Sequence, residues 1–284
     1  MIHKEFTLDL PRRRLPLGRT PAMMGVINVT PDSFSDGGDM SDADSALAAA
    51  RRMSAEGAAI IDIGGESTRP GAVEVDEATE LNRVLPPLEA IGEAKIEMAL
   101  SIDTLKPEVA RRAIAAGAEI LNDVTGLQGA PEMAEVAAEA DVGVVAMHWD
   151  KARDRGKDVV GEIKRWLEAT IRIAQAAGVR QDRLVLDPGF GFAKDFSENY
   201  TILRRLDELA TLGFPLLVGM SRKSMLGKLL GTPPKERGAA TVATSVIAWQ
   251  KGAHIFRVHE VRENLEAIRV AMAVEDGPPP PVEI

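Results

Sequence analysis

The sequence contains no cysteine among its 284 residues. The chain can therefore form neither disulfides nor thiolate metal sites, which is compatible with the reducing cytoplasm, where we expect the protein to act. No segment reaches the roughly 18 unbroken apolar residues that a membrane-spanning helix needs. The N-terminal stretch MIHKEFTLDLPRRRLPLG has no apolar signal core, so we expect no secretion and no membrane partner.

The sequence also has fewer basic than acidic residues. The 34 Lys and Arg residues face 43 Asp and Glu residues, which leaves a net charge of −9. A general nucleic-acid-binding protein presents a basic field, so the charge argues against that class. The 45% hydrophobic content is ample for a large core, and the length fits one barrel-sized α/β domain or two small domains.

A regular alternation of short apolar runs and helical patterns begins at Ala22. Short bounded apolar runs are typical of buried strands, and apolar residues at helical spacing follow each one. The expected strands are Ala22–Val29, Ala59–Gly65, Met98–Thr104, Glu119–Gly126, Val142–Trp149, Arg183–Phe190, Pro215–Ser221 and His254–Val261. The expected helices are Asp42–Glu56, Asp76–Gly92, Pro107–Ala116, Pro131–Ala140, Gly161–Ala177, Glu198–Leu212, a stretch after Ser221 broken near Gly231–Pro234, and Arg262–Val274.

Eight strand–helix pairs favour a closed parallel (β/α)8 TIM barrel. The alternative is a doubly wound open sheet, but no Gly-rich dinucleotide loop follows the first strand. We expect one domain over residues 1–284, with its core at about 20–275 and a disordered tail at 276–284. The segments Glu5–Leu10 and Arg14–Gly18 could form a hairpin that plugs one end.

Acidic and amide side chains stand at the ends of several predicted strands. Asp103, Asn122, Asp123 and Asp187 take such positions, which a barrel gathers at one mouth. Pooled acceptors of this kind suit either a divalent metal or a ring rich in N–H donors. Any one of them could merely cap the next helix, but together they indicate a site.

Cations and hydroxyls follow the last two predicted strands. Ser221, Lys223 and Ser224 come directly after Gly219, a chemistry suited to an anion or a polar ring. Arg257 and His259 are alternate residues on one face of the final strand. Each could be a core cap, but opposite Lys223 the two are better explained as contacts to a flat ring and an anion.

Two loops complete the predicted mouth. The loop Thr30–Gly38 is either an ordinary connection or a mobile lid bearing Ser33, Phe34 and Asp36. Arg69 lies in a Gly-, Ser- and Thr-rich loop that could grip phosphate.

For Asp62, Met147 and His148 there is also an explanation that involves no ligand. Asp62 stands inside an apolar run, where an unpaired carboxylate is costly, so it could simply pair with Arg69. Met147 is expected in the core or as a wall against a ring, and His148 in a structural role. The mixed-charge stretch Asp150–Asp158 is expected to be a solvated loop.

The order and content of seven motifs resemble the dihydropteroate synthases, the folate-pathway enzymes that sulfonamides target. The motifs are MGVINVTPDSFSDGG, IIDIGGESTRPGA, SIDT, NDVTG, DPGFGFAKD, LLVGMSRKSMLG and FRVHEV. The resemblance implies a (β/α)8 barrel that joins p-aminobenzoate to hydroxymethyl-dihydropterin pyrophosphate and releases pyrophosphate by way of a cationic pterin methylene. It also implies Mg²⁺ and a homodimer. The stretch WDKARDRG departs from the Arg-Gly-Thr-Pro-like run of many members.

The resemblance also implies roles for individual residues. The pterin contacts would be Asp62, Asp103, Asn122, Met147, Asp187, Lys223 and Arg257. Pyrophosphate would meet Asn28, Thr68, Arg69, Arg257 and His259, with Mg²⁺ on Asn28. The p-aminobenzoate side would comprise Phe34, Thr68, Pro70, Phe192, Lys223 and Ser224. The catalytic set would be Asp103, Asp187, Lys223 and Arg257.

Three rival hypotheses remain at this point. A methyltetrahydrofolate-binding methyltransferase domain shares the barrel and the pterin acceptors, but it needs a cobalamin partner and has no use for the ESTRP and SRKS anion grips. A catalytically silent paralogue would bind pterin without turnover. Lys223 could instead form a Schiff base, as in barrel aldolases.

Overall fold

The computed structural model describes residues 3–29, 42–67 and 73–280. Within these residues eight parallel strands form one sheet in the order β8-β7-β6-β5-β4-β3-β10-β9. The strands are β3 (Ala22–Asn28), β4 (Ala58–Gly64), β5 (Ala99–Asp103), β6 (Ile120–Asp123), β7 (Gly143–Met147), β8 (Leu184–Asp187), β9 (Leu217–Val218) and β10 (Ile255–Val258). The sheet edges meet at a parallel bridge between Leu186 and Leu216. This nearly closed barrel confirms the predicted fold class.

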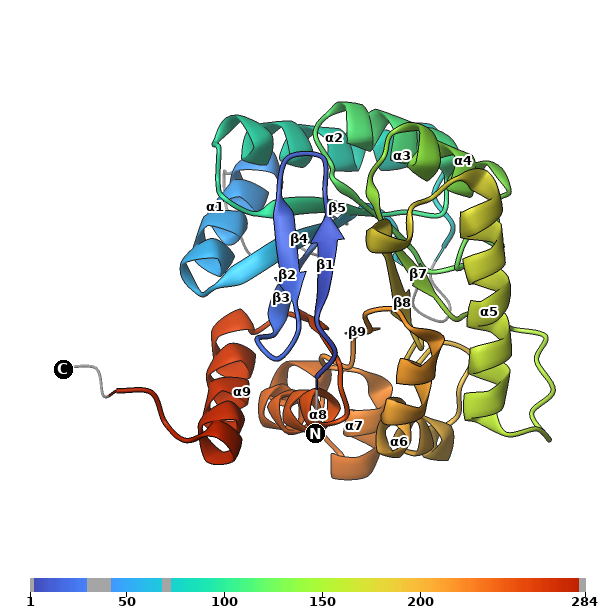
Figure 1. The fold of residues 1–284 in the computed structure, drawn as a ribbon. Helices are drawn as coiled ribbons and strands as arrows, with labels where there is room; N and C mark the ends of the chain where they lie inside the picture. Colours follow the sequence, from blue (N-terminus) through green and yellow to red (C-terminus); the bar gives the residue numbers. More distant parts are fainter. Residues whose placement is uncertain (1–2, 30–41, 68–72, 281–284) are drawn as a thin grey trace.

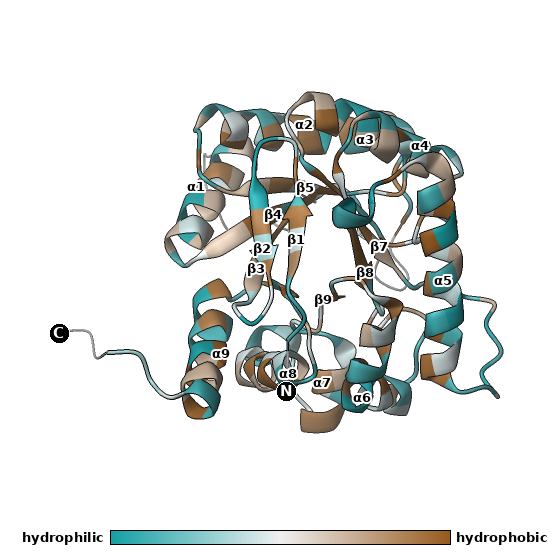
Figure 2. Ribbon diagram, in the orientation of Figure 1, coloured by the Kyte–Doolittle hydropathy of each residue, from teal (hydrophilic) through white to brown (hydrophobic). Residues whose placement is uncertain are grey.

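Helices cover the outside of the barrel (Figure 1). They are α1 (Asp42–Ala55), α2 (Glu77–Glu93), α3 (Pro107–Ala115), α4 (Glu132–Glu139), α5 (Val159–Ala177), α6 (Phe196–Arg204), α7 (Ser224–Leu230), α8 (Gly238–Gln250) and α9 (Val261–Asp276), with 3-10 turns at Gln181–Arg183, Leu206–Leu212 and Pro234–Glu236. The strands are mainly apolar, whereas the helices mix apolar and polar residues (Figure 2). Within the described ranges, no helix combines the length and apolarity needed to cross a membrane.

Several predicted elements have the wrong bounds. The strands predicted at 119–126 and 254–261 shorten to β6 and β10, and three further elements differ for visible reasons. The helix predicted at Glu198–Leu212 leaves the α conformation at Arg205 (φ −110°, ψ 21°) and continues as a 3-10 turn. The strand predicted at Arg183–Phe190 is only β8, because Pro188 has no N–H for the ladder and Gly189 is left-handed (φ 71°). The strand predicted at Pro215–Ser221 shrinks to the two residues of β9.

The predicted N-terminal hairpin is present and plugs the barrel. Strands β1 (Phe6–Asp9) and β2 (Arg14–Leu17) pair antiparallel and lie across the barrel end in Figure 1. Their Leu8, Leu10 and Leu17 side chains are buried against residues inside the barrel. The barrel partners are Ala22, Met24, Ile60, Ala99, Ile120, Val145, Val185, Leu217 and Ile255. Because these partners stand mostly before the ends of their strands, the plug closes the amino end and leaves the carboxyl end for chemistry.

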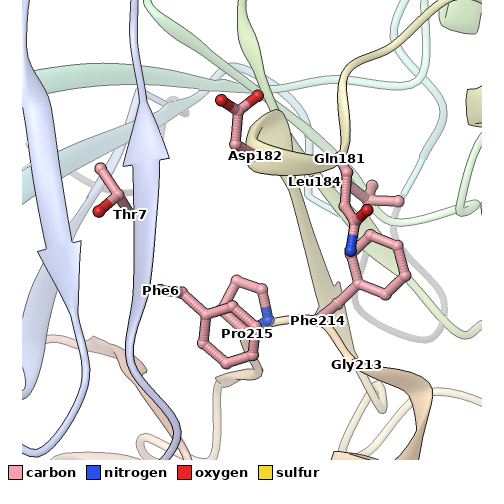
Figure 3. Close-up of a pocket in the computed structure, with 8 residues that line it drawn as sticks. All are labelled: Phe6, Thr7, Gln181, Asp182, Leu184, Gly213, Phe214 and Pro215. Atoms are coloured by element: carbon pink, nitrogen blue, oxygen red, sulfur yellow. The ribbon is translucent and has the colours of Figure 1, made fainter.

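A cavity of about 390 Å³ lies beside this plug. Figure 3 shows Phe6 and Thr7 on the hairpin side and the chain Gly213–Pro215 opposite, with Gln181 and Asp182 at the edge. Among the predicted site residues that the structure describes, none lines this cavity.

The predicted single-domain division stays a prediction. Of the predicted tail at 276–284, Asp276 is instead the last residue of α9. Residues 277–280 are exposed and carry no regular secondary structure, while 281–284 lie outside the described residues.

Candidate active site

Residues at the carboxyl ends of neighbouring strands stand level with one another. Asn28 pairs in register with Gly64, Gly64 with Asp103, and Asp103 with Asn122, across β3 to β6. On the other side of the barrel, Met147 and Asp187 are register partners. The barrel therefore brings these strand-end residues to one mouth, as predicted.

Arg257 lies at the centre of this mouth. Its Nε donates to Asp62 Oδ2 over 2.6 Å, and its Nη2 donates to Asp103 Oδ2 over 2.8 Å. The fully buried Asp62 also accepts the Ser101 hydroxyl (2.6 Å) and the Asn122 amide (3.0 Å). A buried carboxylate with this many donors is fully compensated. The structure thus pairs Asp62 with Arg257. Arg69, the partner that the sequence suggested for Asp62, lies outside the described residues.

Asp103 is poised to change its charge near neutral pH. Burial raises the pKa of the Asp103 carboxyl to about 7; the Arg257 guanidinium opposes this rise and the Asp62 carboxylate adds to it. The carboxylates Asp62 and Asp103 in turn outweigh the effect of burial on Arg257 and raise its pKa. A strongly shifted acid in a polar mouth is the usual mark of a functional group.

A second cluster joins Asp187 to Lys223. Asp187 is buried and accepts the Gly189 N–H over 2.7 Å, and burial raises the pKa of its carboxyl. Lys223 donates to the Phe190 carbonyl, and its Nζ lies 4.6 Å from the centre of the Phe192 ring. Burial lowers the pKa of Lys223 to about 8, although the Asp187 carboxylate opposes this shift. The amine is therefore also close to its titration point at neutral pH.

A third cluster fixes His259 beside the other two. The Ser221 hydroxyl lies 2.9 Å from His259 Nδ1, and the His259 backbone N–H donates to the same hydroxyl over 3.3 Å. Arg222, the cation between Ser221 and Lys223, is instead paired with Glu260 (Nε to Oε1, 2.7 Å). Of the two adjacent cations, only Lys223 reaches the Asp187 cluster.

The remaining predicted residues are placed as follows. Met147 is buried, Asn28 and Phe192 are half-buried, and Ser224 is exposed at the start of α7. The predicted residues Ser33, Phe34, Asp36, Thr68, Arg69 and Pro70 lie outside the described residues.

Asp123 does not belong to the mouth, contrary to the sequence-based expectation. Both of its oxygens are used on the turn that follows β6, since they accept the Thr125 N–H (2.8 Å), the Thr125 hydroxyl (2.7 Å) and the Leu127 N–H (2.8 Å). It therefore fixes the turn after β6 and does not cap the next helix, α4, which begins at Glu132.

Three polar residues near the site were missed from the sequence. Ser101 could have been found, because it stands two residues before Asp103 and so shares its face of the strand. Lys194 Nζ lies 2.8 Å from His148 Nδ1, and only the position of Lys194 in a Gly- and Phe-rich stretch could have indicated it. Arg153 is buried and donates to the Ala193 carbonyl over 3.2 Å, so the expectation of a wholly solvated Asp150–Asp158 loop is wrong.

The residues at the mouth fit a magnesium ion only if phosphate oxygens and water supply most of its ligands. Among the described residues, no group of three or more His, Cys, Asp or Glu side chains could hold a metal. The half-buried Asn28 offers an amide oxygen at the end of β3. Mg²⁺ prefers hard oxygen ligands and often takes one or two from protein and the rest from phosphates and water. A site that includes a pyrophosphate group is therefore chemically compatible with Asn28.

Comparisons with known proteins agree with this geometry. The family model described as "Pterin binding enzyme" matches residues 24–259. Dihydropteroate synthase of Escherichia coli (strain K12) is 47% identical over 259 residues, covering 89% of this chain and 91% of its own. The structure of Xanthomonas albilineans dihydropteroate synthase with 4-aminobenzoic acid superposes with a TM-score of 0.92 at 44% identity, covering 97% of this chain and 100% of its own.

A second Xanthomonas albilineans structure, in complex with 7,8-dihydropteroate, gives a TM-score of 0.88 at 42% identity and covers 96% of this chain and 100% of its own. Both the sequence and the fold are thus shared over nearly the full length of these proteins. The chain belongs to the dihydropteroate synthase family of pterin-binding enzymes.

Proposed function

We propose that this protein is a dihydropteroate synthase, a transferase that joins p-aminobenzoate to hydroxymethyl-dihydropterin pyrophosphate. The cluster of Asp62, Asp103, Asn122 and Arg257 carries the proposal, because it offers carboxylate and amide acceptors to a ring rich in N–H donors. Similar proteins have been solved with 4-aminobenzoic acid and with 7,8-dihydropteroate, the amine substrate and the product of this reaction.

In the reaction, the bond between the pterin methylene carbon and the pyrophosphate oxygen breaks, and the oxygen keeps the electron pair. The amine nitrogen of p-aminobenzoate then forms a bond to the methylene carbon and gives up a proton to solvent. Because the amine is a weak nucleophile, the enzyme must stabilise the leaving group and a cationic methylene. No covalent bond to the protein is required.

We assign the residues by charge. Ionised Asp103 and Asp187 would accept pterin N–H groups and disperse positive charge into the ring, with Met147 as an apolar wall. Arg257 and His259 would face the pyrophosphate, together with Asn28. A bound Mg²⁺ on Asn28 would neutralise leaving-group charge. Lys223, Phe192 and Ser224 would form the p-aminobenzoate side. The roles of Thr68, Arg69, Pro70 and Phe34, and the cytoplasmic location, stay predictions.

The decisive experiment is a coupled pyrophosphate-release assay in which the pterin pyrophosphate, Mg²⁺ and p-aminobenzoate are omitted in turn. We expect release to require all three, with dihydropteroate formed in step. Saturable pterin binding by calorimetry without release would favour the silent paralogue or the methyltransferase domain. Absence of both release and binding would mean that the assembled mouth is not a pterin site.

Lys223 should not act as a Schiff-base lysine in this reaction. Its Nζ donates to the Phe190 carbonyl, and the proposed chemistry offers it no carbonyl substrate. Borohydride treatment in the presence of both substrates should therefore leave Lys223 unmodified by mass spectrometry. A trapped adduct would support the aldolase-like alternative.

We also propose that the chain forms a homodimer. Large apolar side chains are exposed on three successive helices of the barrel: Leu229 and Leu230 on α7, Ile247 on α8, and Val270 and Val274 on α9. Exposed apolar side chains that gather on neighbouring elements favour association. Analytical ultracentrifugation should give a dimer, and Leu230→Glu should shift it toward monomer, while Val73→Glu, at an exposed residue outside these helices, should not.

A further inference from the structure

The loop that follows β8 packs directly against the end of β7. Gly189 has a positive φ of 71°, and a Cβ at this position would lie 2.1 Å from the His148 carbonyl oxygen. Any side chain there would therefore push the loop away from β7. The contact places the loop residues Phe190 and Phe192 close to the chain at His148.

Lys194 ties the same two segments together. Its Nζ lies 2.8 Å from His148 Nδ1, 3.2 Å from the His148 carbonyl and 3.0 Å from the Phe192 carbonyl. The two carbonyl oxygens accept from the amine, and the imidazole nitrogen completes its contacts. Burial lowers the pKa of Lys194 well below its ordinary value, and the Asp187 carboxylate opposes this shift. The three contacts reduce the cost of burying the amine without removing it.

His148 serves in this arrangement as a neutral hydrogen-bond partner rather than as an acid or base. Burial, with Lys194 and Arg153 nearby, lowers the pKa of His148 to about 2, so the imidazole is neutral at physiological pH. The ring packs edge-on against Trp166 with centres 5.5 Å apart, which fixes its orientation.

The segment that Lys194 holds is the one that meets Lys223. The Phe192 ring lies 4.6 Å from Lys223 Nζ on one side and packs edge-on against Trp149, with centres 5.3 Å apart. The next carbonyl, that of Ala193, accepts from Arg153 over 3.2 Å. The backbone on both sides of the Phe192–Ala193 peptide is thus anchored to residues that follow β7.

We propose that Lys194, held by His148, is a positioning residue that fixes Phe192 beside Lys223 and so shapes the p-aminobenzoate side of the mouth. The assignment rests on the proposed function for the identity of the substrate. It places Lys194 outside the reacting atoms, because its three bonds all go to protein groups. Its effect should therefore fall on binding of the aromatic amine and not on the pterin.

Lys194→Met tests the proposal by keeping the chain length and removing the donors. We expect the KM for p-aminobenzoate to rise about tenfold, with the KM for the pterin pyrophosphate and kcat within about twofold of the parent. Lys194→Gln keeps an N–H donor and should recover part of the loss. Lys157→Met, at an exposed lysine of the neighbouring loop, is the matched control and should match the parent.

A double-mutant cycle tests the link to His148. His148→Leu should raise the KM for p-aminobenzoate as Lys194→Met does, and combining the two should add little, because both changes remove one shared contact. Fully additive effects would show that the two residues act separately and would overturn the pairing. An equal rise of KM for both substrates in Lys194→Gln would overturn the positioning role.

A measurement that needs no enzymatic turnover tests this proposal independently of the proposed function. In protein labelled with 5-fluorotryptophan, the ¹⁹F signal of Trp149, assigned with Trp149→Phe, should move in Lys194→Met and Lys194→Gln. The signal of Trp249, which packs against His3, should stay. If the parent lacks synthase activity, the function fails, but a moved Trp149 signal still supports the positioning role. An unmoved Trp149 signal in both variants overturns it.

Discussion

The Nε atom of Arg257 lies 2.6 Å from Oδ2 of Asp62, although 195 residues separate the two in the chain. Asp62 is fully buried in β4, whereas the Arg257 side chain is 24% exposed at the mouth. The buried carboxylate therefore holds the guanidinium in the orientation in which its Nη2 reaches Asp103. Stability and site geometry depend on the same contact.

Removing the charge of Asp62 should damage both stability and activity. Asp62→Asn removes the buried carboxylate that faces Arg257 Nε and leaves Asp103 to pair with the guanidinium, a loss that typically costs about 3 kcal/mol of unfolding free energy. Urea denaturation should show this loss, and kcat/KM should fall by about a hundredfold as Arg257 changes orientation. Ser101→Ala, which removes one neutral donor to Asp62, should cost only about 1 kcal/mol. Equal stability of Asp62→Asn and the parent would contradict the assigned role.

The pH dependence of kcat/KM should be bell-shaped with its maximum between about pH 7 and 8. As the pH falls below about 7, Asp103 takes up a proton. Its carboxyl can then no longer accept from both Arg257 and a pterin N–H group. As the pH rises above about 8, Lys223 loses its charge. Initial rates at low substrate concentration report these free-enzyme pKa values.

Two variants assign the limbs of this profile. Asp103→Asn should be much less active, and its residual activity should lack the acidic limb. Lys223→Arg should move the alkaline limb beyond the accessible range, because a guanidinium keeps its proton. An acidic limb that persists in Asp103→Asn would assign that limb to another group, such as Asp187.

Ser221→Ala should release the His259 ring. The hydroxyl holds both Nδ1 and the backbone N–H of His259, and loss of such a contact is worth about 1 kcal/mol. We expect the KM for the pterin pyrophosphate to rise about fivefold and the KM for p-aminobenzoate to stay unchanged. Thr211→Ala, at an exposed hydroxyl that donates to the Glu208 carbonyl, is the matched control. A rise in the KM for p-aminobenzoate alone would place His259 on the p-aminobenzoate side of the mouth and contradict its assignment to the pyrophosphate.

Leu8→Ala should lower the stability of the fold and leave the catalytic activity unchanged. Leu8 is 1% exposed in the plug at the amino end of the barrel, and such a truncation typically costs about 2–4 kcal/mol. Thermal unfolding should show the loss, while kcat at a temperature well below the transition stays at the parent value. The half-buried Leu15 of the same hairpin should cost less when changed to Ala. A lower kcat in folded Leu8→Ala would mean that the plug shapes the mouth.

Much of the fold and part of the site follow from local patterns in the sequence. Bounded apolar runs and helical spacing placed all eight strands, and the barrel then required Asp103, Asn122, Asp187 and Lys223 to meet at one end, as they do. Strand ends were less well predicted, because a two-residue strand such as β9 depends on its neighbours and not on its own composition.

What the sequence by itself determined is therefore the alternation of elements and the residue types at their ends, since both depend on periods of two and 3.6 along the chain. The tertiary structure alone decided the distant partners: Arg257 with Asp62, Lys194 with His148, and Arg153 with Ala193. Such pairings depend on barrel closure and strand register, which join residues far apart in the chain, and no local period encodes them.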